Sequence, residues 1–92
     1  MEISFDPEKR ARNLAKHGLD LADAGEVLAG FCIDLLDDLN EHGEERWAST
    51  GMLGYMIVVC IWTERGGDEA RIISLRRATA HEQKDYLSEY FG

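Results

Sequence analysis

The chain contains one long run of apolar positions, at residues 55–63, where β-branched, aromatic and sulfur-containing side chains follow one another almost without a polar residue. Such a run predicts a strand that is buried on both faces of a sheet. A second strand is predicted at residues 71–77, after the tight turn Arg65-Gly66-Gly67-Asp68. Strict alternation along this strand would place Ile72, Ser74 and Arg76 on one face, with Arg71, Leu75 and Arg77 on the other.

Three helices are predicted from their capping residues. The first has Asp6 as N-cap, runs from Pro7 to His17 and ends at Gly18. Its apolar stripe is Ala11, Leu14 and Ala15, and its polar face carries Lys9, Asn13 and Lys16. The second begins at Asp20, ends at Gly30 and has Ala24, Val27 and Leu28 facing inward, while Thr79 and Glu82 form the capping box of the last helix.

The remaining strands are predicted from short apolar segments between turn formers, at residues 2–5, 31–36 and 45–52, with a turn at residues 37–43. The element order is therefore β-α-α-β-β-β-β-α. This order predicts a single α+β domain over residues 1–92, in which an antiparallel β-sheet carries two N-terminal helices and one C-terminal helix.

The formal charge of −8 argues against nucleic acid as the default partner. However, the basic residues fall into two clusters, which are separated by an acidic segment at residues 34–45. If the fold brings the two clusters together, a local positive site can exist on an acidic protein. The clusters are Lys9, Arg10, Arg12 and Lys16, and Arg65, Arg71, Arg76 and Arg77.

The first residues lack the basic and apolar regions of a signal peptide, and no apolar run approaches the roughly 20 residues that span a bilayer. Cys32 and Cys60 lie within apolar runs, which favours two reduced, buried thiols over a disulfide. We therefore expect a cytoplasmic protein.

Several segments together resemble the BrnT family of ribonuclease toxins, the partners of BrnA antitoxins. They cover the chain in the family's order: Phe5-Asp-Pro-x-Lys9, Asn13-x-x-Lys16-His17-Gly18, Ala24 and its helix, Gly43-Glu-Glu-Arg46, Thr63-Glu-Arg65-Gly66, Arg71-Ile-Ile-Ser74 through Arg76 to Ala78-Thr79, Glu82 and Tyr86. The resemblance implies a RelE-like fold and metal-independent cleavage of RNA that suppresses translation. It also implies an antitoxin whose ribbon-helix-helix domain binds DNA, so that operator binding belongs to the complex.

RNA cleavage without a metal ion needs an acid and a base for the proton transfers, and cations that stabilise the charge on the phosphorane. The expected catalytic residues are His17, Arg65, Arg76 and Arg77, and the expected phosphate-binding residues are Lys16, Arg46 and Ser74. Each has a structural alternative: His17 could only cap its helix, and the arginines could only pair with carboxylates. Arg71 is expected to pair with Glu64, Asp68 or Glu69.

No cofactor is expected. His42, Glu44 and Glu45 are close in sequence but lack a further ligand at metal spacing, so no metal site is predicted. The competing hypothesis is a non-catalytic protein-binding module that acts as a co-regulator with a DNA-binding partner.

Overall fold

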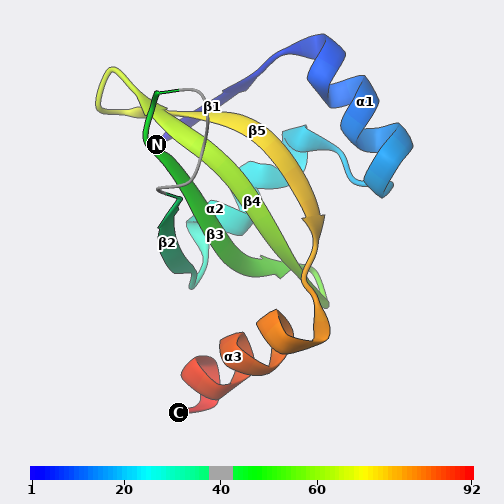
Figure 1. Ribbon diagram of the computed structural model, residues 1–92, viewed down its shortest axis with the longest axis vertical. Helices are drawn as coiled ribbons and strands as arrows, with labels where there is room; N and C mark the ends of the chain where they lie inside the picture. The colour runs from blue at the N-terminus through cyan, green and yellow to red at the C-terminus, as the bar shows by residue number, and fades with distance from the viewer. Residues whose placement is uncertain (38–42) are drawn as a thin grey trace.

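A computed structural model describes residues 1–37 and 43–92, so His42 and most of the turn predicted at residues 37–43 lie outside the described part. The strands are β1 (Glu2–Phe5), β2 (Ile33–Asp37), β3 (Arg46–Leu53), β4 (Met56–Arg65) and β5 (Glu69–Arg77). The helices are α1 (Pro7–His17), the short 3-10 helix η1 (Leu21–Asp23), α2 (Ala24–Ala29) and α3 (Ala80–Phe91). The predicted α+β class and element order are confirmed (Figure 1).

The strands form one sheet in the order β1-β5-β4-β3-β2, with the apolar strand β4 at its centre. The four strands from β2 to β5 are joined as an antiparallel meander, whereas β1 pairs parallel to β5. The sheet is therefore mixed, although mostly antiparallel. The local pattern of residues 2–5 predicts a strand, but it holds no information on the direction of its distant partner.

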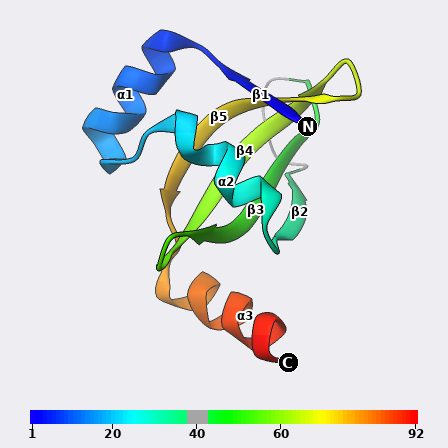
Figure 2. The ribbon, with the colours of Figure 1, turned by 180° about the vertical axis from the view of Figure 1, so that it is seen from behind.

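The main core lies between the sheet and the segment from η1 to α2. Figure 2 shows α2 lying across the sheet, with α1 beside β5. The predicted inward side of this segment is confirmed, because Ala24 and Val27 are fully buried and Leu28 packs against the same cluster. From the sheet, the core takes Val58, Cys60, Ala70, Ile72 and Leu75.

Strand β5 contains a bulge at Ile73, so the strict alternation predicted for this strand is wrong. Ile61 pairs with Ser74 and Trp62 with Ile72, which leaves Ile73 as the extra residue. A bulge moves every later side chain to the opposite face. Ile72 and Leu75 consequently share the core face with Arg77, while Arg71, Ser74 and Arg76 share the other face.

Helix α1 turns its polar face toward the sheet. Its one buried residue is Asn13, whereas Leu14 in the apolar stripe is 50% exposed. The Asn13 side-chain nitrogen donates to the carbonyls of Leu75 (2.9 Å) and Leu19 (2.8 Å), and its oxygen accepts from the Leu75 N–H (3.0 Å). Because β1 pairs with β5 only as far as Ile72, Asn13 takes the place of a neighbouring strand at Leu75.

Helix α3 lies at the end of the sheet where β5 finishes (Figure 1). Both hydrogen bonds of the predicted capping box are present between Thr79 and Glu82. Tyr86 is buried and its hydroxyl donates to the Phe31 carbonyl at 2.9 Å. The helix is therefore held at its start by the cap and at its middle by the segment before β2.

Cys32 and Cys60 are free thiols, as predicted. Burial raises the pKa of Cys32 to about 11 and that of Cys60 to about 12, so neither is a reactive thiolate at neutral pH. No helix in the described residues is long and apolar enough to cross a membrane.

Replacement of Asn13 by alanine should destabilise the protein. Asn13→Ala leaves the buried N–H and carbonyl of Leu75 without partners, and we expect the free energy of unfolding to fall by about 3 kcal/mol. Urea unfolding followed by circular dichroism measures this change. The control is Arg12→Ala, on the exposed part of the same helix, which should change the stability by less than about 0.5 kcal/mol. Equal stability of the two variants would show that Asn13 does not hold α1 in place.

Candidate functional site

A hollow of about 330 Å³ lies between α1 and β5, and four of its seven lining residues are basic or histidine side chains. It is lined by Lys9, Arg12, Asn13, Lys16, His17, Ile73 and Ser74. The α1 positions are spaced by three or four residues, so they lie on one side of the helix. Asn13 fixes that side against β5, and the bulge at Ile73 brings Ser74 to the same place.

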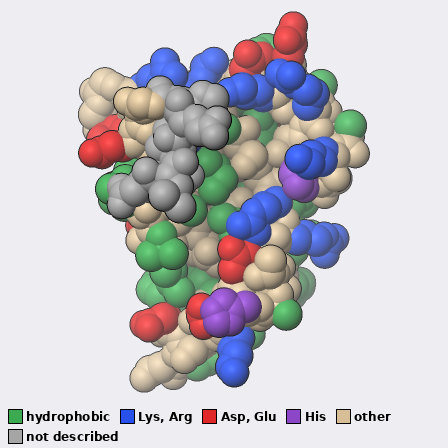
Figure 3. Space-filling model, in the orientation of Figure 1, with side chains coloured by type: hydrophobic (Ala, Val, Ile, Leu, Met, Phe, Trp, Pro, Cys, Tyr) green, Lys and Arg blue, Asp and Glu red, His purple; other side chains and the backbone are tan. Residues whose placement is uncertain are grey.

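The cations of this hollow have no ion pair with any described residue. On the same helix, Arg10 is paired with Asp20 at 2.8 Å, so α1 has its only described ion pair outside the hollow. Figure 3 shows Lys and Arg side chains along the upper and right margins of this view, over the region of α1 and β5 in Figure 1, with one histidine among them. A positive surface of this kind attracts an anion in spite of the net charge of −8.

Lys16, His17 and Ser74 are thus brought together, as the sequence hypothesis requires. Lys9 and Arg12 line the same hollow, although they were not among the predicted site residues. Their spacing relative to Lys16 was the signal that could have identified them, because residues 9, 12 and 16 recur at helical intervals.

Arg76 lies on β5 two residues beyond Ser74, but its guanidinium is held by Glu82. Two parallel hydrogen bonds of 2.8 and 2.9 Å join them, and the Glu82 carboxylate also accepts from the Thr79 N–H. The hydrogen bonds from Arg76, followed by the one from Thr79, lower the pKa of Glu82 to about 2. Arg76 therefore fixes the start of α3 to the end of β5.

Arg46 and Arg65 lie in a different, mainly acidic place. Both are within 4 Å of Glu44, at 3.4 and 3.9 Å. The hollow beside them is lined by Glu44, Glu45, Trp47, Thr63, Glu64 and Arg65. Arg65 is four residues along β4 from Ile61, the partner of Ser74, which corresponds to about 13 Å of strand. The structure does not bring these two arginines to the hollow of His17.

The two remaining arginines of β5 also differ from expectation. Arg71 forms no ion pair with a described residue, so its predicted pairing with Glu64, Asp68 or Glu69 is wrong. Glu69 instead accepts a hydrogen bond of 2.7 Å from the Ser4 hydroxyl. Arg77 lines a separate hollow at the start of α3.

The described residues contain no group of three or more His, Cys, Asp or Glu side chains that could hold a metal ion. The chemistry that the α1–β5 hollow offers is instead that of an imidazole and a hydroxyl next to three long cationic side chains. This combination suits the binding of phosphate and the transfer of a proton beside it.

The family model for the ribonuclease toxin BrnT of type II toxin–antitoxin systems matches residues 5–82. The chain belongs to the BrnT family. The match includes α1, the whole sheet from β2 to β5 and the start of α3. A BrnT protein is a ribonuclease toxin, and membership of a type II system implies a cognate antitoxin.

A crystal structure of the ribonuclease toxin BrnT from Brucella abortus has the same fold. The TM-score is 0.64 at 30% sequence identity, and the match covers 86% of this chain and 97% of the Brucella protein. No curated protein sequence matches the chain. The resemblance read from the short motifs is therefore confirmed by the family model and by the structure.

The Arg76–Glu82 pair should make the stability depend on pH in the acid range. Because the pKa of Glu82 is lower in the folded state than its ordinary value of 4.5, the contribution is complete above about pH 4.5 and decreases as the pH falls toward 2. Glu82→Gln should lower the free energy of unfolding by about 1 kcal/mol at pH 7. The difference in the free energy of unfolding between Glu82→Gln and wild type should become smaller between pH 4.5 and pH 2, and urea unfolding at each pH measures it. The control is Glu89→Gln on the same helix, and a constant difference at all pH values would contradict the assignment.

Proposed function

We propose that this protein cleaves RNA without a metal ion and inhibits translation, and that the hollow between α1 and β5 holds the phosphate of the cleaved bond. The observation that carries the proposal is the convergence of Lys9, Arg12, Lys16 and His17 beside Ser74, with no described carboxylate paired to them. The choice of RNA cleavage as the reaction rests on membership of a ribonuclease toxin family.

The side chains of the hollow suit the three needs of metal-independent cleavage. His17 is the proposed acid/base group, because an imidazole can exchange a proton near neutral pH and this one lines the hollow. Lys16 and Arg12 are the proposed cations that stabilise the phosphorane, and Ser74 is a hydrogen-bond donor for a phosphate oxygen. In the reaction, the 2′-oxygen forms a bond to phosphorus and the bond to the 5′-oxygen breaks. The proton of the 2′-hydroxyl leaves to a base, and the 5′-oxygen takes one from an acid.

Arg76 has a positioning role in this proposal. Its two terminal nitrogens are engaged by Glu82, and it lies next to Ser74 on the same face of β5. The acidic surroundings of Arg46 and Arg65 would repel an RNA backbone, because three glutamates line that hollow. We therefore place the reaction at α1 and β5 and leave those two arginines out of it.

The proposed partner is a BrnA-like antitoxin with a ribbon-helix-helix DNA-binding domain. This proposal rests on family membership, since a type II toxin has a cognate antitoxin. Binding of the pair to DNA would occur through the antitoxin, which agrees with the acidic net charge of the toxin itself.

Removal of the His17 imidazole should slow RNA cleavage. His17→Ala should lower the rate constant on single-stranded RNA by about 100-fold or more in the presence of EDTA. The matched control is His81→Ala, because His81 is an exposed histidine of α3 that does not line the hollow. Single-turnover cleavage of a labelled RNA measures both rates. Equal rates for the two variants would remove His17 from the mechanism, and no cleavage by wild type together with harmless expression would favour the protein-binding module.

Loss of Lys16 should weaken RNA binding through the loss of one phosphate contact. The slope of log K against log salt concentration should decrease by about 0.7 in Lys16→Ala, because one fewer counterion is released from the single strand. Lys84→Ala, which removes an exposed lysine of α3, should leave the slope unchanged. Fluorescence anisotropy at several salt concentrations measures the slope. Identical slopes for the two variants would contradict a phosphate contact at Lys16.

A further inference from the structure

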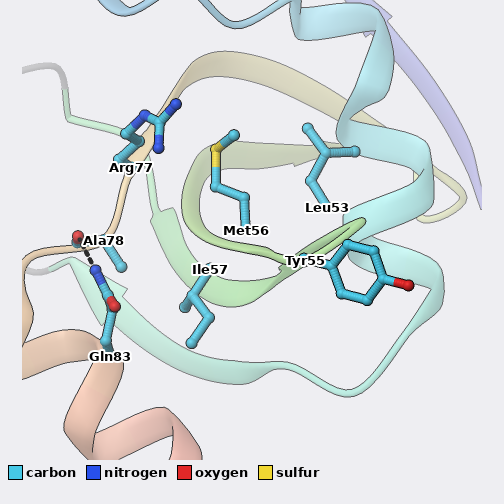
Figure 4. A pocket seen from close by; sticks show the side chains of 7 residues that line it. All are labelled: Leu53, Tyr55, Met56, Ile57, Arg77, Ala78 and Gln83. Atoms are coloured by element: carbon cyan, nitrogen blue, oxygen red, sulfur yellow. Dashed lines mark hydrogen bonds between the residues drawn. The ribbon is translucent and has the colours of Figure 1, made fainter.

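A second pocket, of about 450 Å³, lies where the turn between β3 and β4 approaches the start of α3. It is lined by Leu53, Tyr55, Met56, Ile57, Arg77, Ala78 and Gln83. Figure 4 shows Arg77 and Gln83 on one side of it, Tyr55 on the other, and the apolar side chains between them. Leu53 and Met56 also pack against the apolar core, whereas Tyr55 lies outside the core and Arg77 forms no ion pair with a described residue.

The Tyr55 ring is fully exposed on a tight turn. Gly54 has a positive φ of 61°, which lets the chain reverse between Leu53 and Met56 and holds Tyr55 at the outermost position. An aromatic ring that touches no core residue is free to stack on a flat ligand.

The polar side chains of Arg77 and Gln83 lie on the side of the pocket opposite Tyr55 (Figure 4). Arg77 forms no ion pair with a described residue, so its charge is available to an anion. The Gln83 side-chain nitrogen donates to the Ala78 carbonyl at 3.0 Å, which fixes the amide and leaves its oxygen as an acceptor. A flat apolar ligand with a hydrogen-bond donor and a nearby negative charge fits this combination. A nucleotide has these features.

We propose that this pocket binds an unpaired base of the RNA, with Tyr55 stacking on the base and Arg77 contacting an adjacent phosphate. The proposal rests on the function proposed above. Arg77 is three residues along β5 from Ser74, which corresponds to about 10 Å of strand, and its side chain lies on the opposite face of the strand. Strand β1 ends opposite Ile72 and leaves this part of the β5 edge without a neighbouring strand, so a short stretch of single-stranded RNA that passes around the edge contacts both places. The bases of a duplex are already stacked on their neighbours, and therefore Tyr55 favours the unstacked bases of single-stranded RNA.

The first test uses an RNA oligonucleotide in which every 2′-hydroxyl is methylated, so that it binds without being cleaved. One base at a time is replaced by an abasic residue, and binding is measured by fluorescence anisotropy. With wild type, one abasic position should weaken binding about tenfold. With Tyr55→Ala, binding of the intact oligonucleotide should be weaker by a similar factor, and that abasic position should have no further effect.

The matched control is Tyr90→Ala, which removes an exposed tyrosine of α3 that does not line the pocket. It should retain the wild-type abasic profile. Tyr55 makes no buried contact, so thermal unfolding of Tyr55→Ala should coincide with that of wild type. Arg77→Ala should reduce the slope of log K against log salt by about 0.7, while Tyr55→Ala should leave the slope unchanged.

An abasic profile that is the same in wild type and in Tyr55→Ala would overturn the base-binding pocket. That result does not bear on cleavage at His17, because cleavage is measured separately on unmodified RNA with His17→Ala. A different result would be that wild type cuts no RNA in any condition, while one abasic position still weakens binding to wild type but not to Tyr55→Ala. That result would overturn the proposed reaction and support the base-binding pocket. Failure of wild type to bind the oligonucleotide at all would overturn both.

Discussion

The pairing of the Asn13 side chain with the backbone of Leu75 determines where the functional surface of this protein lies. Strand β1 ends opposite Ile72, and beyond that point the edge of β5 has no neighbouring strand. A buried N–H and carbonyl without partners would be costly, and one carboxamide satisfies both. Helix α1 is consequently attached through its polar face. Its lysines, Arg12 and His17 then line the hollow beside β5, and the small apolar stripe around Leu14 is left exposed.

In this fold the cations that are paired with carboxylates and the cations that are not paired lie in different places. Carboxylates engage Arg10, Arg46, Arg65 and Arg76, which lie outside the α1–β5 hollow. The cations of the hollow and the Arg71 and Arg77 side chains have no described carboxylate partner. An acidic protein thereby keeps a local positive surface, and screening over about 8–10 Å lets that surface act separately from the net charge. The acidity of the chain and the binding of a polyanion are compatible for this reason.

Local signals were sufficient to predict the elements and their order. Caps at Asp6, Asp20 and Thr79 and the apolar run of β4 set these features, and each depends on residues close in sequence. The parallel pairing of β1, the bulge at Ile73 and the face that α1 turns to the sheet depend on contacts between distant residues. The candidate site was likewise predicted only in part. Lys16, His17 and Ser74 line one hollow, as their predicted roles require. The carboxylate that pairs with an arginine depends on the three-dimensional fold and cannot be identified from local sequence. Arg46, Arg65 and Arg76 were therefore predicted to act on RNA, although each is paired with a glutamate in the structure.

The central claim is that RNA binds at α1 and the end of β5, and not at the acidic hollow beside Arg46 and Arg65. Backbone amide shifts measured by NMR during titration with a 2′-O-methylated single-stranded RNA test it directly. The account predicts the largest changes at residues 9–17 and 73–77, with small changes at residues 44–46 and 63–65. Changes confined to residues 44–46 and 63–65 would contradict it.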